Sequence, residues 1–125
     1  MASELENLKI YQMASALELE VYKSTKSFPG DEKYRSIDQL RRSSASVTNN
    51  IAESYEKRSL KERVYIWGDI VKGEAQETKN GLMMALQKGF HDNKDVIDRY
   101  TELLKAVSGY IRFLKTNSEH SERNQ

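Results

Sequence analysis

Apolar residues recur every three or four positions in four separate stretches of the chain. This spacing places them on one face of an α-helix, whereas a half-buried strand would alternate apolar and polar residues. The stretches predict helices over residues 5–27, 32–56, 60–88 and 93–115. The last has the most regular period, with inward positions at Val96, Tyr100, Leu103, Val107, Tyr110 and Leu114. The pattern therefore predicts an all-α protein.

The other three stretches supply the rest of the predicted core. Their inward positions are Ile10, Ala14, Leu17 and Val21 in the first, Tyr34, Ile37, Leu40, Ser44, Val47, Ile51 and Tyr55 in the second, and Val64, Trp67, Val71, Thr78, Leu82 and Ala85 in the third. Each set forms a stripe along one face of its helix, so we expect the four stripes to meet in a shared interior.

Turn and capping residues separate the stretches. Pro29 disfavours helical backbone at Phe28, the residue before it, so the first helix should end before the proline. Asp31 and Asp92 are expected to cap the second and fourth helices, and Ser59 opens the third, with a glutamate three residues later. Gly89 suits the left-handed conformation that closes the third helix.

The connections between these long helices are short, which favours neighbours that run antiparallel. We therefore predict an up-down-up-down antiparallel four-helix bundle formed by residues 1–116. Residues 117–125 are polar with nothing to bury, and we expect them to form a disordered tail. A chain of 125 residues is expected to form one domain.

Composition narrows the class of protein further. Lys and Arg number 20 against 19 Asp and Glu, a net charge of +1, so no overall field draws the chain to nucleic acid or acidic lipid. The absence of cysteine excludes disulfides, thiolate nucleophiles and cysteine zinc sites. No apolar stretch approaches the roughly 20 residues that cross a bilayer, and no export signal is visible. We expect a soluble, cytoplasmic protein that does not contact a membrane.

Reaction chemistry has no candidate residues in this sequence. A metal site in a bundle would need inward Glu and His at i, i+3 spacing, but His91 falls in a turn and His120 in the polar tail. Gly68, Gly73 and Gly81 lie inside one helical pattern and match no phosphate-binding loop. They either admit a neighbouring helix or are tolerated on the surface, and the spacing does not decide between the two. We expect no enzyme activity: no catalytic residue, no metal, no cofactor and no small-molecule substrate.

Residues 39–53 form the most unusual stretch, because Ser, Thr and Asn crowd a helical period although they are mediocre helix formers. One hypothesis is close contact between helices through small residues. A second is a buried polar network joining Arg42, Asn50, Glu53 and Glu77, which stabilises the fold only if every member is paired. A third is a solvated polar face. The sequence leaves all three open.

A basic corner lies between the second and third helices, formed by Lys57, Arg58, Lys61 and Arg63. Such a cluster can contact phosphates, which makes these four residues the candidates for nucleic-acid binding. Glutamates interrupt the cluster and basic helix ends are common, so an ordinary solvated helix end is the alternative.

Four segments in the first half of the chain carry a specific pattern. They are Leu8-Lys9-Ile10-Tyr11-Gln12-Met13-Ala14, Val21-Tyr22, Phe28-Pro29 followed by Glu32 and Tyr34, and the stretch from Gln39 to Glu53. This pattern resembles the four-helix bundle family of 23S rRNA intervening-sequence proteins. Ser54 departs from the resemblance, standing where the family usually has Gly, and Glu74 stands where it usually has Ser. The spacing from Ser59 to Gly73 is also expected to differ by a residue.

The resemblance implies an up-and-down bundle that assembles into a ring, a homopentamer, in the bacterial cytoplasm. The family is also similar to the accessory variability proteins of diversity-generating retroelements, bundles that join a reverse transcriptase and nucleic acid. Matched residue by residue, it implies a structural role for Arg42, Ser46, Asn50 and Glu53, and for Glu77 as their partner. We therefore expect a non-enzymatic homo-oligomer that associates with RNA or with a nucleic-acid-processing protein. The alternative is a protein-binding or structural module with no affinity for nucleic acid.

Overall fold

Helices form every regular element of the computed structural model, which describes the backbone of residues 2–123 and the side chains of residues 8–117. The long helices are α1 (Ala2–Thr25), α2 (Asp38–Ser54), α4 (Lys72–Gln87) and α5 (Lys94–Arg123). The shorter segments are the 3₁₀ turn η1 (Gly30–Glu32), the π-helical turn η2 (Lys33–Ile37), the helix α3 (Leu60–Tyr65) and the π-helical turn η3 (Ile66–Val71). Because η1 and η2 run directly into α2, and α3 and η3 run directly into α4, the chain forms four rods. The all-α prediction is confirmed.

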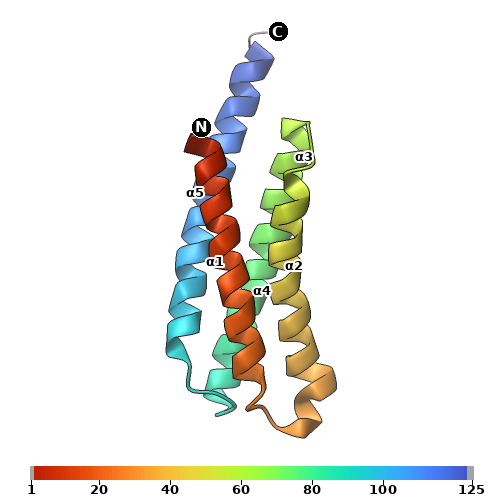
Figure 1. Ribbon diagram of the computed structural model, residues 1–125, viewed down its shortest axis with the longest axis vertical. Coiled ribbons are helices and arrows are strands. Elements are labelled where there is room, and N and C mark those ends of the chain that lie inside the picture. Colours follow the sequence, from red (N-terminus) through yellow and green to blue (C-terminus); the bar gives the residue numbers. More distant parts are fainter. Residues whose placement is uncertain (1, 124–125) are drawn as a thin grey trace.

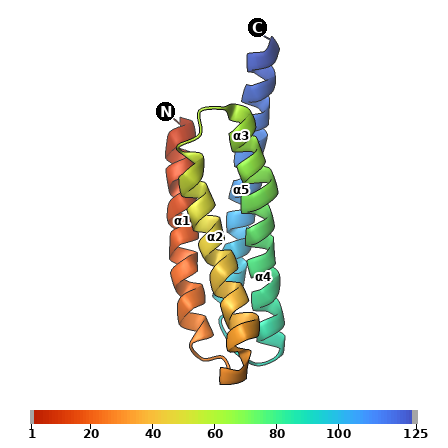
Figure 2. The same ribbon diagram turned by 90° about the vertical axis from the view of Figure 1, so that its right-hand side faces the viewer.

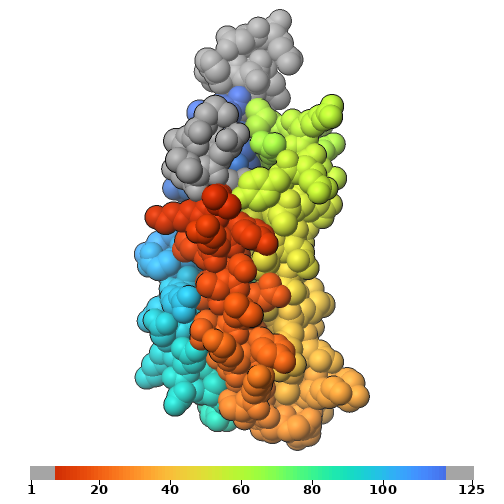
Figure 3. Space-filling view, viewed as in Figure 1, coloured from red at the N-terminus to blue at the C-terminus, as the bar shows by residue number. Residues whose placement is uncertain are grey.

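The four rods run antiparallel in the order of the sequence (Figures 1 and 2). α1 packs against α2 and α5, and α4 packs against the same two helices. In the space-filling view, side chains of α1 and α2 meet along much of the visible face (Figure 3). Two connections lie at the lower end in Figure 1, and the connection from α2 to α3 lies at the upper end. The up-down-up-down four-helix bundle is therefore confirmed.

The inward stripes predicted from the period make up the core. Every predicted inward position of α5 is buried, and Trp67 of η3 is fully buried with its ring 4.6 Å from that of Tyr110. Tyr55 and Tyr34, at the two ends of the second rod, are the exceptions and are exposed. Tyr34 is 83% exposed because it lies in η2, where the wider π turn breaks the 3.6-residue period that predicted it as inward.

The helix boundaries match the capping residues in part. Ser59 Oγ accepts the backbone N–H three residues later at 3.4 Å, and Gly89 has a φ of 80°, as predicted for both. The prediction for Asp92 is wrong: α5 starts later, and Asn93 Oδ1 accepts the N–H three residues on at 3.1 Å. Asp31 does not cap the second rod, which opens instead with the 3₁₀ turn that follows the proline.

The two loops at the lower end pack on each other. The buried ring of Phe28, between α1 and η1, lies 5.4 Å from the Phe90 ring and stacks on His91 at 5.9 Å. His91 Nδ1 accepts the N–H of Asn93 at 3.0 Å, so Nε2 carries the proton and donates to the Leu82 carbonyl at 2.9 Å. The histidine in this turn therefore orders the connection between α4 and α5.

The last helix is longer than predicted. Its backbone is helical to Arg123 and projects beyond the other helices (Figure 1), whereas the sequence predicts a disordered tail from residue 117. Once a helix is nucleated, each added residue forms another backbone hydrogen bond without needing a buried side chain. Residues 124–125 lie outside the described residues.

Candidate polar motif and nucleic-acid interface

The polar stretch of α2 has a buried side and an exposed side. Ser43, Ser44, Thr48 and Ser54 are buried, whereas Arg42, Asn49 and Glu53 are exposed. Ser44, Thr48 and Ser54 each donate to a carbonyl of their own helix three or four residues earlier, whereas the Ser43 hydroxyl lies 2.7 Å from that of Thr78 in α4. Three of the four hydroxyl protons are thus used within α2 itself, and the small side chains let neighbouring helices come close. Both the small-residue and the solvated-face hypotheses hold, each for one side of the helix.

One buried serine also supports the core. Ser54 Oγ accepts a hydrogen bond from Trp67 Nε1 at 3.1 Å. Buried indole N–H groups need such a partner, and a glycine at this position would offer no side-chain acceptor. Ser54, which stands where the resemblance implies a glycine, therefore supplies the acceptor for Trp67.

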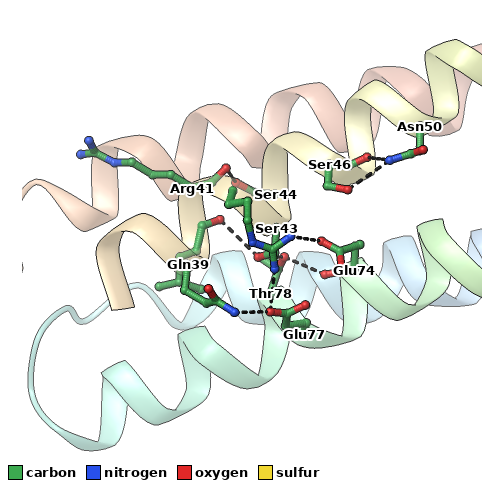
Figure 4. Close-up of polar contacts among 11 residues, drawn as sticks. Gln39, Arg41, Ser43, Ser44, Ser46, Asn50, Glu74, Glu77 and Thr78 are labelled. Atoms are coloured by element: carbon green, nitrogen blue, oxygen red, sulfur yellow. Dashed lines mark hydrogen bonds and ion pairs between the residues drawn. The ribbon is translucent and has the colours of Figure 1, made fainter. Parts of the chain in front are cut away.

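Arg42 joins α2 to α4 on the exposed side. Its Nη1 lies 3.1 Å from Glu74 Oε2 and its Nη2 lies 2.9 Å from Glu77 Oε1, while Gln39 Nε2 donates to Glu77 at 2.7 Å. Figure 4 shows Glu74 and Glu77 of α4 turned toward this part of α2. Attraction to Glu74, together with the hydrogen bond to Glu77, raises the pKa of Arg42. We call these four residues the α2–α4 clamp.

The clamp is a surface feature and contributes only modestly to stability. The Arg42 side chain is 52% exposed, so water screens its two ion pairs. Exposed pairs of this kind are worth up to about 1 kcal/mol. The clamp therefore joins α2 and α4 at the surface and adds little to the stability of the bundle.

The predicted network of Arg42, Asn50, Glu53 and Glu77 does not form as a unit. Asn50 Nδ2 donates to the backbone and side-chain oxygens of Ser46 at 2.8 and 3.1 Å, away from the clamp (Figure 4). Glu53 pairs with Lys57 at 3.8 Å. Arg42 and Asn50 are two helical turns apart, about 12 Å along the axis, so one carboxylate cannot reach both. The sequence paired Arg42 with Glu77 correctly but missed Gln39 and Glu74.

Glu77 faces α2 from a rod that contains a π-helical turn before it. The π-helical turn η3 lies between Ser59 and Gly73, the segment that is expected from the resemblance to differ in spacing by a residue. A π turn takes in one residue more than an α turn does. It can therefore change the length of this segment by a residue and keep Glu77 directed at the clamp.

Beneath the clamp, α2 and α4 share a buried hydroxyl pair. Ser43 Oγ and Thr78 Oγ1 are 2.7 Å apart, and Thr78 Oγ1 donates to the Glu74 carbonyl at 2.8 Å. Each hydroxyl has one proton, and the Thr78 hydroxyl is closer to its helix carbonyl, at 2.8 Å, than the Ser43 hydroxyl is to the Leu40 carbonyl, at 3.3 Å, which favours Ser43 as the donor between the two. This chain of hydrogen bonds fixes the register of the two helices from the inside.

The glycines of the third rod differ in their surroundings. A Cβ added at Gly81 would lie 2.7 Å from Leu40 Cδ2, so this glycine admits α2 at close range. A Cβ at Gly68 or Gly73 would meet nothing within 4 Å. The hypothesis that a glycine admits a neighbouring helix is thus correct for Gly81. The hypothesis that a glycine is tolerated at an open position is correct for Gly68 and Gly73.

The basic corner lies at the upper end of the bundle, where α2 turns into α3 (Figure 1). Arg58 and Lys61 are exposed, and the half-exposed Lys57 pairs only loosely with Glu53 at 3.8 Å. Arg63 Nε donates to the Lys57 carbonyl at 2.8 Å and so holds the backbone of the turn. Three of the four predicted cations therefore lie at the surface of this end of the bundle, and Arg63 has a structural bond.

Within the described side chains, no group of three or more His, Asp or Glu residues could hold a metal ion. His120 lies outside them. No helix in the described part of the chain is long and apolar enough to cross a membrane.

Two tyrosines also have a raised pKa. Burial, with a smaller effect of Glu18, raises the pKa of Tyr100 well above its ordinary value. Its Oη is buried without a hydrogen-bond partner among the described residues. Tyr55 is 40% exposed, and the partial burial of its side chain raises its pKa, with smaller effects of Tyr110 and Tyr11. The period identified Tyr100 as inward but gave no indication that its hydroxyl would be unpaired.

Comparison with known proteins identifies the family. A sequence model of the 23S rRNA-intervening sequence protein family matches residues 6–111. The matched range includes the polar stretch of α2, the basic corner, the clamp and most of the α5 core. A search of curated proteins gives no match. The chain belongs to the family of 23S rRNA-intervening sequence proteins.

Proposed function

We propose that this chain is a non-enzymatic, homo-oligomeric bundle that associates with RNA as a scaffold or accessory protein. The observation that carries the proposal is the position of Lys57, Arg58 and Lys61, which lie at one end of the bundle and take no part in its core. Membership of the family supports this type of protein.

Binding through this corner must act locally, because the whole chain has a net charge of only +1. Phosphate contacts release condensed counterions, which makes such binding weaken with added salt. A homo-oligomeric ring, a homopentamer by family resemblance, would repeat the corner in every subunit. Repetition raises the avidity of contacts that are individually weak, provided the subunits can bind at once. A cytoplasmic location belongs to the same proposal.

The test is salt-dependent binding of a single-stranded RNA, measured by fluorescence anisotropy, with the triple variant Lys57→Ala, Arg58→Ala, Lys61→Ala. Loss of three phosphate contacts is expected to weaken binding at low salt and to reduce the slope of log affinity against log salt by about 2. The matched control replaces Lys33, Lys88 and Lys94, three exposed lysines at the opposite end of the bundle, with Ala.

The control removes the same charge, so it separates the corner from the net charge. Equal weakening by both triple variants would show that binding is unspecific. No detectable RNA binding by the parent chain at low salt would refute the proposal.

The second candidate is a protein-binding or structural module with no nucleic-acid affinity. The near balance of charge favours it, as do the exposed side chains of Leu19 and Met84, at 59% and 52%. This alternative predicts no anisotropy change with RNA and co-purification of a stoichiometric protein partner.

A further inference from the structure

A groove of about 500 Å³ adjoins the basic corner on the outer side of α2, α3 and η3. We propose that it holds one base of single-stranded RNA, a base that carries an exocyclic amino group, while Lys57 and Lys61 at its edge contact the flanking phosphates. This inference rests on the proposed RNA association and names the chemistry of the site. The volume lies within the usual range for small-ligand sites.

The groove offers a surface on which a base can stack. Tyr65 lines it and is 58% exposed, while Ile66 and Ile70 supply apolar wall. An exposed aromatic ring beside apolar side chains and lysines is the arrangement that proteins use to stack bases of single strands. Any base can stack on an aromatic ring, so stacking contributes affinity but does not discriminate among the bases.

The polar groups of the groove select among bases. Asn50 Nδ2 is committed to the backbone carbonyl of Ser46, which can only accept, so the amide orientation is fixed and Oδ1 remains as the acceptor. The carboxylates of Glu53 and Glu62 line the same groove and also only accept. Partners for these oxygens must donate. The exocyclic amino groups of cytosine, adenine and guanine offer two protons each, whereas uracil has an acceptor at O4 and offers only its single N3–H.

The charges of the groove fix which part of a nucleotide it takes. Two lysines and two glutamates line it, so its net charge is zero. A phosphate inside the groove would meet the carboxylates, whereas a neutral base would not. The lysines are therefore left for phosphates on either side of the bound base, continuing the basic corner.

The experiment compares binding of short oligocytidine and oligouridine by fluorescence anisotropy at one salt concentration. The parent chain is expected to bind oligocytidine several-fold more tightly. Tyr65→Ala should weaken binding of both about tenfold, since a lost stacking platform affects every base. Asn50→Ala should reduce the cytidine preference and leave the salt slope unchanged, because it removes an acceptor and no charge.

Matched controls are Tyr34→Ala, an exposed tyrosine at the other end of the bundle, and Asn49→Ala, the exposed neighbour of Asn50. Both should bind like the parent, and thermal melting confirms that each variant is folded. Equal affinity for the two oligonucleotides, or parent-like binding by Tyr65→Ala, overturns the groove assignment while leaving RNA association intact. Absence of binding to either oligonucleotide overturns both proposals. A changed solution mass of Tyr65→Ala with parent-like binding assigns the groove to a subunit interface and also overturns the inference.

Discussion

At the residue scale, Tyr100 shows a conflict between packing and hydrogen bonding. Its ring completes the core stripe of α5 and is 1% exposed, yet its Oη has no hydrogen-bond partner among the described residues. An unpaired buried polar group costs about 1–3 kcal/mol. The apolar period can place the ring inside, but it carries no information about a partner for the hydroxyl.

Replacing Tyr100 with Phe is expected to raise the free energy of unfolding at neutral pH by about 1 kcal/mol, because it removes an unpaired hydroxyl and keeps the ring. Urea unfolding measures the change, and Tyr34→Phe at the exposed position is the control, expected to have no effect. A loss of stability in Tyr100→Phe would reveal that the hydroxyl has a partner.

The same residue predicts how stability changes with pH. The pKa of Tyr100 is raised in the folded chain relative to its ordinary value of 10.0. Above about pH 10 the unfolded phenol loses its proton while the buried one keeps it, so the folded state loses stability as pH rises, by up to about 1.4 kcal/mol per pH unit. Tyr100→Phe should lose stability less steeply than the parent between pH 9 and 11, whereas Tyr34→Phe should not differ.

At the scale of elements, the contact between α2 and α4 combines three features. The α2–α4 clamp lies outside, the Ser43 and Thr78 hydroxyl pair lies inside, and Gly81 lets Leu40 approach the backbone of α4. The hydroxyl pair and the glycine act at short range and are buried, so they hold the spacing of the helices more strongly than exposed ions do.

Gly81→Ala tests the close approach. A Cβ 2.7 Å from Leu40 Cδ2 must displace a side chain that is 2% exposed, which costs about 1–3 kcal/mol. This exceeds the gain of up to about 1 kcal/mol from replacing a helical glycine, so a lower melting temperature is expected.

Gly73→Ala is the matched control for this substitution. It lies in the same helix with open space around it, and should raise the melting temperature. If both substitutions stabilise the chain, Leu40 moves aside easily and the two helices are not held at this distance.

At the scale of the whole molecule, the apolar faces of the four rods enclose one shared core, while several large apolar side chains are exposed on the surface. Leu19, Met83 and Met84 are 59%, 42% and 52% exposed. Exposed apolar side chains of this size are often covered by another subunit, and most oligomers are symmetric assemblies of one chain.

Light scattering is expected to give a solution mass that is a multiple of 14.5 kDa, with five subunits if the family resemblance extends to assembly. The mass should persist at high salt, because apolar contacts do not weaken as phosphate contacts do. A mass of one chain at micromolar concentration would contradict the homo-oligomer and remove avidity from the RNA proposal.

The sequence predictions that are confirmed depend on nearby residues of the chain, and those that are wrong depend on tertiary contacts or on irregular turns. The period predicted every inward position of α5, and the chemistry of Ser59 and Gly89 predicted both helix ends, because these depend on neighbours within one or two turns. The prediction of Tyr34 as an inward residue is wrong because a π turn changes the rotation per residue, and the composition of the segment does not reveal such a turn. The sequence predicts Arg63 as a candidate for nucleic-acid binding, but its side chain donates to the Lys57 carbonyl, and this contact depends on how the turn folds back.

The sequence by itself determined the four helices, their inward faces, their antiparallel order and the family. Only the tertiary structure decided that Arg42 binds Glu74 as well as Glu77, that Asn50 is left facing a groove, and that Gly81 alone among the three glycines meets a neighbouring helix. The physical reason is that helical periodicity repeats within a few residues and is fixed by local hydrogen bonds. Which side chains meet between helices depends on how each rod is rotated and shifted, and the π turns η2 and η3 set that rotation here.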